Sequence, residues 1–303
     1  MSRAFAIMTF EELCNQLFNQ FNIKEKLKMA APFEWIDTHT HLARDYSRAE
    51  LEKFFEGGHC KGIWLHSIEC FKNSPRHCGN DEVLKIAKLY PEFVHPFAYC
   101  RAEQNPDQIR MLKDAGFTGL KFIDPLYNYD DPRFFPFYAE AEKLNMPCYF
   151  HVGCIAKKPS SELAFPGLYS SPGRMKPAML CTIAAEFPKL SIIAGHPGVP
   201  WSEEMTTALW YYPNIRCTIS ALTDYKWFID TLACGAWDGV PFYEKFMFGT
   251  DFAYGIPITF DMANEFAIFY KIFFREAGKT MIWGRHNQDF MINNARKLLE
   301  NLS

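Results

Sequence analysis

Two histidines and an aspartate lie in one apolar run near the start of the chain. The run is IDTHTHL at residues 36–42, and it contains Asp37, His39 and His41. Because side chains alternate between the two faces of a β-strand, these three are expected on one face and the two threonines on the other. Two imidazoles at positions i and i+2 can meet a single ion. The motif therefore indicates a metal site, although a His-X-His pair alone also arises by chance.

Four later apolar runs also end in residues that can do chemistry. They are Lys121 in GLKF, His151 in CYFHVG, His196 in IIAGHPG and Asp251 in FMFGTDF. If these runs are strands of a parallel barrel, the residues lie at the C-terminal strand ends, where barrel enzymes carry their active sites. Gly249 shares a face with Asp251 and leaves room below its carboxylate. The coincidence of all these residues is stronger evidence than any single motif.

Imidazole nitrogens and carboxylate oxygens suit one divalent ion, with Zn²⁺ favoured and Mn²⁺, Fe²⁺ or Co²⁺ as alternatives. The predicted ligands are His39, His41, His151 and Asp251. A catalytic ion keeps one position open for water, whose pKa it lowers to about 7, so a metal-bound hydroxide becomes available. His196 is the predicted proton carrier, because the ordinary pKa of histidine lies near neutrality. Asp37 is expected to support the ligands from below.

The elements that must position these residues alternate along the chain. Eight runs are predicted strands: Glu34–His41, Gly62–Ser67, Val94–Cys100, Gly119–Ile123, Cys148–Val152, Ser191–Gly195, Ile215–Ser220 and Phe246–Asp251. Helical patterns follow at Glu50–Glu56, Asp81–Leu89, Pro106–Ala115, Pro132–Leu144, Arg174–Phe187, Ser202–Tyr212, Tyr225–Ala236, Ile258–Phe274 and Asn287–Leu302. Eight βα units predict an α/β fold, a (β/α)₈ TIM barrel. A doubly wound sheet is less favoured, because no GxGxxG or GxxxxGK[ST] loop follows any predicted strand.

The predicted organisation is one barrel domain with an addition at its start. Residues 1–33 have apolar side chains at helical spacing and are predicted to form an N-terminal helical extension. Residues 34–303 are predicted to form the metal-dependent barrel, since no linker rich in Gly, Ser or Pro divides them.

Composition narrows the class of partner. The formal net charge is −3, which gives no basic field for nucleic acid or an anionic membrane, so a small-molecule substrate is expected. The ten cysteines are scattered without a CxxC pair, and the chain shows neither a signal-peptide core nor a run of roughly 20 apolar residues. These features predict reduced thiols and a cytoplasmic location.

The remaining histidines are expected to have simpler roles. His66 and His95, in or beside predicted strands, are expected to be structural, and His59, His77 and His286 to lie in loops or at the surface.

Taken together, IDTHTHL, FHVG, GHPG and FGTDF resemble motifs of the amidohydrolase superfamily. The resemblance is to the amidohydrolase-2 branch, which contains aminocarboxymuconate-semialdehyde decarboxylase and metal-dependent lactonases, and it extends from Glu34 to the C-terminus. It implies the ligand set given above, with His196 as base or electrostatic partner and with Asp251 able both to bind the metal and to accept a proton. It also implies a homodimer.

Lys121 has three interpretations. The resemblance to the mostly mononuclear branch favours an unmodified lysine that contacts an anionic substrate group or an oxyanion. In binuclear members of the superfamily, a strand-four lysine is carboxylated and bridges two metals. A structural salt bridge to Asp124 is the third interpretation.

The expected activity is metal-dependent hydrolysis of an amide, ester or lactone bond in a small molecule. The alternative is non-oxidative decarboxylation of an unsaturated or aromatic carboxylic acid, which an arginine aimed into the pocket would favour, with Arg101 as the nearest candidate. A third hypothesis is a barrel that binds metal and ligand without turnover.

Overall fold

The computed structural model describes residues 34–57, 59–71, 74, 77–155, 171–220, 227, 236–237, 240–241, 244–255, 267 and 288–302. The predicted N-terminal extension, residues 1–33, lies outside this part of the chain, as does nearly all of the predicted helices Tyr225–Ala236 and Ile258–Phe274. Ala236 itself belongs to a short strand, β8 (Ala236–Trp237), which pairs antiparallel with β9 (Val240–Pro241).

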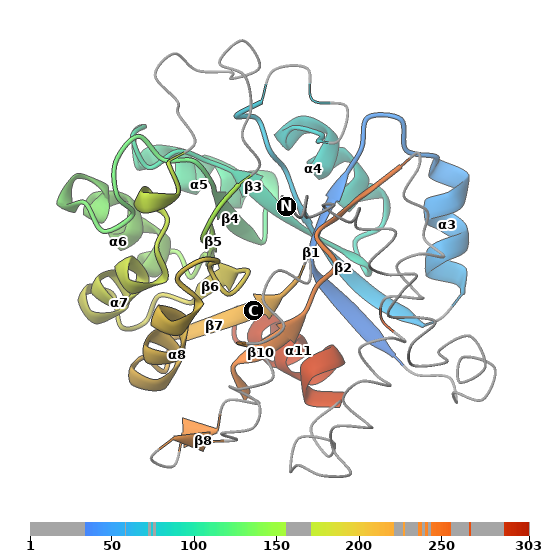
Figure 1. Ribbon diagram of the computed structural model, residues 1–303. Helices are drawn as coiled ribbons and strands as arrows, with labels where there is room; N and C mark the ends of the chain where they lie inside the picture. Colours follow the sequence, from blue (N-terminus) through green and yellow to red (C-terminus); the bar gives the residue numbers. More distant parts are fainter. Residues whose placement is uncertain are drawn as a thin grey trace, which may run out of the picture.

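Seven parallel strands form most of one curled sheet, close to their predicted bounds. They are β1 (Trp35–Leu42), β2 (Cys60–His66), β3 (Val94–Tyr99), β4 (Gly119–Phe122), β5 (Cys148–His151), β6 (Ile192–Gly195) and β7 (Ile215–Ile219). Each pairs with the next in parallel register. Figure 1 shows helices outside these strands on the left, at the top and on the right of the view, as βα units of a barrel place them.

The predicted eighth strand, Phe246–Asp251, is shorter in the structure, and a further strand begins just after its predicted end. Strand β10 (Phe246–Phe248), within the predicted range, pairs with β7, and β11 (Phe252–Tyr254), beyond that range, pairs with β1. The two edges of the nine-stranded sheet are therefore consecutive pieces of chain. The hydroxyl of Thr38 in β1 also donates to the Phe248 carbonyl at 2.7 Å. This arrangement confirms the TIM-barrel α/β fold.

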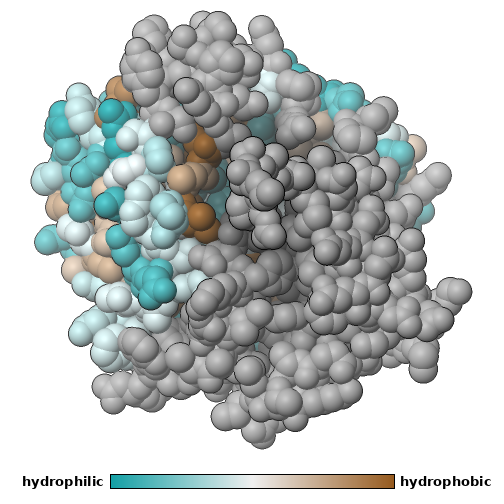
Figure 2. All heavy atoms as spheres, viewed as in Figure 1, coloured by the Kyte–Doolittle hydropathy of each residue, from teal (hydrophilic) through white to brown (hydrophobic). Residues whose placement is uncertain are grey.

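Helices follow the strands in sequence. They are α3 (Arg48–Glu56), α4 (Asn80–Leu89), α5 (Asp107–Ala115), η1 (Pro132–Phe134), α6 (Phe135–Lys143), η3 (Pro172–Arg174), α7 (Pro177–Glu186), α8 (Ser202–Tyr211), the π-helical turn η6 (Asp289–Asn293) and α11 (Asn294–Glu300). In Figure 2 the described residues over α5 to α8, on the left, present mainly hydrophilic side chains, with apolar ones toward the centre of the view. Among the described helices, none has the length and apolarity to cross a bilayer.

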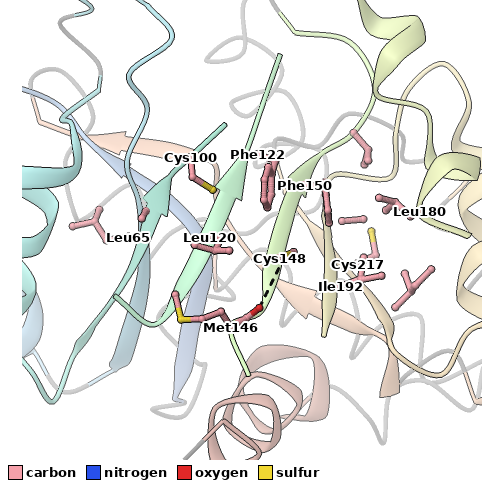
Figure 3. Close-up of a cluster of buried hydrophobic side chains, with 14 of the residues drawn as sticks. Leu65, Cys100, Leu120, Phe122, Met146, Cys148, Phe150, Leu180, Ile192 and Cys217 are labelled. Atoms are coloured by element: carbon pink, nitrogen blue, oxygen red, sulfur yellow. Dashed lines mark hydrogen bonds between the residues drawn. The ribbon is translucent and has the colours of Figure 1, made fainter. Parts of the chain in front are cut away.

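Alternating side chains divide the buried residues into an outer and an inner layer. In β4 and β5, Leu120, Phe122, Cys148 and Phe150 pack toward the helices, as Figure 3 shows for part of this layer. The inner layer includes Trp64, Phe97, Tyr149, Ile193 and Met247, which pack with Ile292 of η6 and Ala295 and Leu298 of α11. The barrel is therefore filled below the strand ends, and polar chemistry is confined to the level above this layer.

The register of β1 against β2 shifts between Asp37 and Thr40, so simple alternation does not hold through the motif. His39 and His41 nevertheless lie close together, with ring centroids 5.4 Å apart. Asp37 turns its carboxylate to Thr250 and Tyr254 in the strand-eight segment. The two histidines therefore lie side by side, while Asp37 joins β1 to the segment behind them.

Candidate metal centre

Three imidazoles converge on the carboxylate of Asp251. The Nε2 atoms of His39 and His41 lie 3.2 and 3.4 Å from Oδ1, and Nε2 of His196 lies 3.7 Å from Oδ2. One donor atom from each of His39, His196 and Asp251 can be chosen so that all three lie within 4.8 Å of one another. The three histidines are buried, and Asp251 is partly exposed. Nitrogen and carboxylate donors converging in this way suit a divalent ion.

Hydrogen bonds on the far sides of the rings orient the two β1 histidines. Nδ1 of His41 lies 2.9 Å from the carbonyl oxygen of His66, and Nδ1 of His39 lies 3.0 Å from the hydroxyl of Ser220. A carbonyl only accepts, so Nδ1 of His41 carries a hydrogen, and Nε2 is the ring nitrogen that faces Asp251. This arrangement is the usual support of a metal-binding histidine.

Asp251 is held by its backbone. Its N–H donates to the His39 carbonyl at 2.7 Å, and its φ of 61° lies in the left-handed region that non-glycine residues seldom adopt. His196 has φ 82° in the same region. Such strain persists where surrounding contacts enforce it, and it concentrates at functional sites.

Gly249 allows the close approach of the elements around Asp251. A Cβ at Gly249 would lie 2.5 Å from Cγ2 of Thr218 and 2.9 Å from Cβ of His39, so no larger residue fits without movement. The missing side chain of Gly249 thus makes room for Thr218 and His39, and the predicted space below the Asp251 carboxylate stays a prediction.

Asp37 joins β1 to the segment that carries Asp251. Its Oδ1 accepts from the backbone N–H groups of His39 at 3.1 Å and Thr250 at 2.9 Å. Its Oδ2 accepts from the hydroxyls of Thr250 and Tyr254, each at 2.7 Å. Burial raises the pKa of Asp37 to about 6, and these hydrogen bonds oppose that rise. Asp37 thus supports the site from behind through Thr250 and the backbone of His39.

The electrostatic environment favours neutral imidazoles around an ionised carboxylate. Burial, reinforced by the Lys121 charge, lowers the pKa of His39 well below its usual value. Burial likewise lowers the pKa of His151 and, to a smaller extent, that of His196. For Asp251, burial alone would raise the pKa, but His196, His41 and Lys121 outweigh it and hold the pKa well below the usual range. Neutral imidazole and ionised carboxylate are the forms that bind metal.

Lys121 lies within the site rather than beside it. Its side chain is fully buried, with Nζ 3.0 Å from Nε2 of His39 and 4.4 Å from the ring centroid of Tyr149. Burial lowers the pKa of Lys121 to about 7, against the opposing effect of Asp251. Among the described residues, Lys121 has neither a hydrogen bond nor an ion pair to Asp124, which argues against the salt bridge considered between them.

His151, a predicted ligand, has a different nearest partner. Its Nε2 lies 3.3 Å from the carbonyl oxygen of Cys154, and its ring centroid is 4.9 Å from that of His196. His151 therefore lies next to the site through its contact with His196. His196 itself belongs to the group of donor atoms within 4.8 Å of one another, with His39 and Asp251.

Sequence reasoning missed several residues that shape the site. Ser220 contacts two histidines, and the His66 backbone orients His41 while the His66 ring lies 4.2 Å from Tyr149. His77 lies in a loop, as expected, and its partly buried ring is 5.1 Å from His41. Every second residue of a β-strand lies on the same face. This alternation along β2, β5 and β7 could have indicated that His66, Tyr149 and Ser220 face the site, because each is two positions from another inward-facing residue.

Comparisons with known proteins identify the family of the chain. The family model described as Amidohydrolase matches residues 36–257. The chain therefore belongs to this family. This membership confirms the resemblance drawn from the sequence motifs. A search of curated proteins finds no match.

Several solved structures share the fold. An uncharacterised TIM-barrel protein from Bordetella bronchiseptica has a TM-score of 0.65 at 15% identity, covering 89% of this chain and 99% of that chain. A 2,6-dihydroxybenzoate decarboxylase from Rhizobium has a TM-score of 0.58 at 18% identity, covering 89% and 100%. A probable 2-pyrone-4,6-dicarboxylic acid hydrolase from Acinetobacter baumannii has a TM-score of 0.58 at 15% identity, covering 88% and 100%.

Proposed function

We propose that the protein is a metal-dependent hydrolase of an amide, ester or lactone bond in a small molecule. The observation that carries the proposal is the convergence of the His39, His41 and His196 imidazoles on the Asp251 carboxylate at the strand ends. The donor set fits one divalent ion, for which Zn²⁺ is the first choice. When bound, such an ion polarises a carbonyl group and makes water more acidic.

The protein's own residues would divide the remaining work. We assign His39, His41 and Asp251 to holding the ion, because both the sequence and the structure bring them together. His151 is the fourth ligand implied by the resemblance. His196 is then left to hold or move a proton at Nε2, which faces Oδ2 of Asp251 at 3.7 Å.

The metal content of two variants tests which of His151 and His196 binds the ion and which carries the proton. If His151 is the ligand, His151→Asn loses the ion, whereas His196→Asn keeps it and loses turnover. The opposite pattern would exchange the two roles, in line with the compact group of His39, His196 and Asp251.

Lys121 is proposed to contact a substrate anion or oxyanion. Its Nζ lies 3.0 Å from Nε2 of His39, the nitrogen proposed to bind metal, so the positive charge of the lysine opposes a cation bound there. We therefore expect Lys121→Met to bind Zn²⁺ more tightly than the native protein and to show a raised KM. A lysine that bridged two metals would give the opposite result, a loss of bound metal.

Decarboxylation of an unsaturated or aromatic acid is the alternative, since the similar solved structures include 2,6-dihydroxybenzoate and 5-carboxyvanillate decarboxylases. The arginine that would favour this reaction, Arg101, forms an ion pair with Glu103 at 3.3 Å. That pairing gives Arg101 a structural partner, and we therefore place hydrolysis first.

The decisive assay presents Zn²⁺-loaded protein with lactones, esters and amides and, separately, with aromatic and unsaturated carboxylic acids. Acid release from the first set supports hydrolysis, and carbon dioxide release from the second supports the alternative. His41→Ala should abolish turnover in either case. Ligand binding without turnover, unchanged in His41→Ala, would favour a barrel that only binds.

A further inference from the structure

Ser220, which follows β7 directly, bridges two histidines of the site. Its side chain is fully buried. The hydroxyl oxygen lies 3.0 Å from Nδ1 of His39 and 3.0 Å from Nδ1 of His196. The two rings are themselves close, with centroids 4.8 Å apart. One hydroxyl therefore contacts the ring nitrogens that point away from Asp251 in both residues.

We propose that Ser220 is a positioning residue that sets the tautomers of His39 and His196 together when the site holds its ion. The inference rests on the proposed function, because it takes His39 Nε2 as a metal ligand. A neutral imidazole that binds through Nε2 carries its hydrogen on Nδ1. Nδ1–H of His39 must then donate to the Ser220 oxygen.

The direction of the second hydrogen bond follows from the first. Because the Ser220 oxygen accepts from His39, its own hydrogen is available, and Nδ1 of His196 is its other partner among the described residues. Donation from Ser220 leaves Nδ1 of His196 as an acceptor, so the hydrogen of neutral His196 lies on Nε2. That nitrogen faces Oδ2 of Asp251 at 3.7 Å. Ser220 thereby directs the N–H of His196 toward the reaction centre.

The backbone beside Ser220 makes the consequence of losing the hydroxyl specific. The carbonyl oxygen of Ser220 lies 3.5 Å from the same Nδ1 of His196. A carbonyl can only accept, so without the hydroxyl it favours hydrogen on Nδ1 and leaves Nε2 bare. His39 simultaneously loses the acceptor for its buried N–H. We expect removal of the hydroxyl to reverse the tautomer of His196 and to weaken metal binding 10- to 100-fold, as is typical for loss of such support.

The test uses full-length protein titrated with Zn²⁺ alone. Calorimetry gives the Zn²⁺ affinity. ¹⁵N NMR of Zn²⁺-loaded protein with labelled histidines gives the tautomer of His196, whose signals are identified because they disappear in His196→Asn. Ser220→Ala removes the hydroxyl, and Ser220→Cys replaces it with a thiol, a much weaker hydrogen-bonding group, without leaving a cavity. Thr218→Val is the matched control, because Thr218 is a buried hydroxyl two residues earlier in β7 that pairs with the Thr38 hydroxyl at 3.0 Å.

We expect the native protein and Thr218→Val to carry the His196 hydrogen on Nε2. In both Ser220 variants we expect that hydrogen on Nδ1 and weaker Zn²⁺ binding. Native affinity and tautomer in Ser220→Ala would overturn the role of Ser220 while leaving the proposed function intact. Equal changes in Thr218→Val would also overturn it, because they would reflect general damage to β7. A native protein that does not bind Zn²⁺ refutes the proposed function, and this inference with it.

Discussion

Removing one hydroxyl from Tyr254 tests whether Asp37 is an ionised anchor of the metal site. Tyr254→Phe deletes the 2.7 Å hydrogen bond to Oδ2 of Asp37 and keeps the buried ring. Asp37 retains its three bonds from Thr250 and the His39 backbone, so no acceptor is left without a donor. The loss is therefore confined to one bond to a charged group.

The expected cost follows from the charge of the acceptor. Hydrogen bonds to charged groups contribute about 1.5–3 kcal/mol to stability, and neutral ones about 0.5–1.5 kcal/mol. Tyr138 supplies the neutral comparison, because its buried hydroxyl donates to the Tyr129 carbonyl at 2.8 Å. We expect Tyr254→Phe to lower the free energy of unfolding by about 2–3 kcal/mol and Tyr138→Phe by about 1 kcal/mol.

Urea unfolding at pH 8 measures both variants, because Asp37, with a pKa raised to about 6 by burial, is then ionised. Zinc titration of the same proteins tests the link to the site. Tyr254→Phe should weaken Zn²⁺ binding about tenfold, since Asp37 also holds His39 and Thr250, and Tyr138→Phe should not. Equal stability losses in the two variants, together with unchanged Zn²⁺ affinity, would refute the anchoring role of Asp37.

Two further predictions concern packing and pH. Gly249→Ala should destabilise the protein by about 1–3 kcal/mol and reduce Zn²⁺ affinity, because the new methyl group meets Thr218 and His39. The double variant Gly249→Ala, Thr218→Ser should recover part of the lost stability, because it removes the Thr218 methyl group. No recovery would argue against that clash. Burial lowers the pKa of His95 to about 4, so the unfolded chain takes up a proton near pH 6.5 before the folded protein does. The stability that neutral His95 contributes is therefore lost as the pH falls from 6.5 to 4. Between pH 7 and pH 4.5, the free energy of unfolding measured with urea should fall by about 2–3 kcal/mol less in His95→Gln than in the native protein. The same fall in both proteins would contradict this prediction.

The fold was largely predictable from the sequence, because buried parallel strands are continuous apolar runs and helices repeat at 3.6 residues. The predicted bounds of β1 to β7 differ from the structure by at most two residues at either end. The end of β10 at Phe248 and the start of β11 at Phe252 were not predictable, since the two strands pair with different partners, β7 and β1. No local pattern within Phe246–Asp251 encodes that choice.

The site was predictable where chemistry is carried by residue type. His39, His41 and Asp251 stood out because such residues are rare at the ends of buried strands, and the structure brings them together. Ser220 was missed because a serine at a strand end is ordinary in sequence. Its role arises only from its distances to His39 and His196, more than twenty residues away in each case.

Simple strand alternation also explained less than expected for Asp37. The register shift within β1 and the hydrogen bonds from Thr250 and Tyr254 decide where its carboxylate points. Those partners lie more than two hundred residues later in the chain, so only the folded barrel reveals them.

Metal analysis after reconstitution with Zn²⁺ tests the central claim most directly. We expect one ion per chain in the native protein, and none in Asp251→Asn, because Asp251 is the carboxylate on which the imidazoles converge. No bound ion in the native protein, or a full equivalent retained in Asp251→Asn, would contradict the proposed metal centre. Two ions per chain, one of them lost in Lys121→Met, would contradict the single-metal assignment.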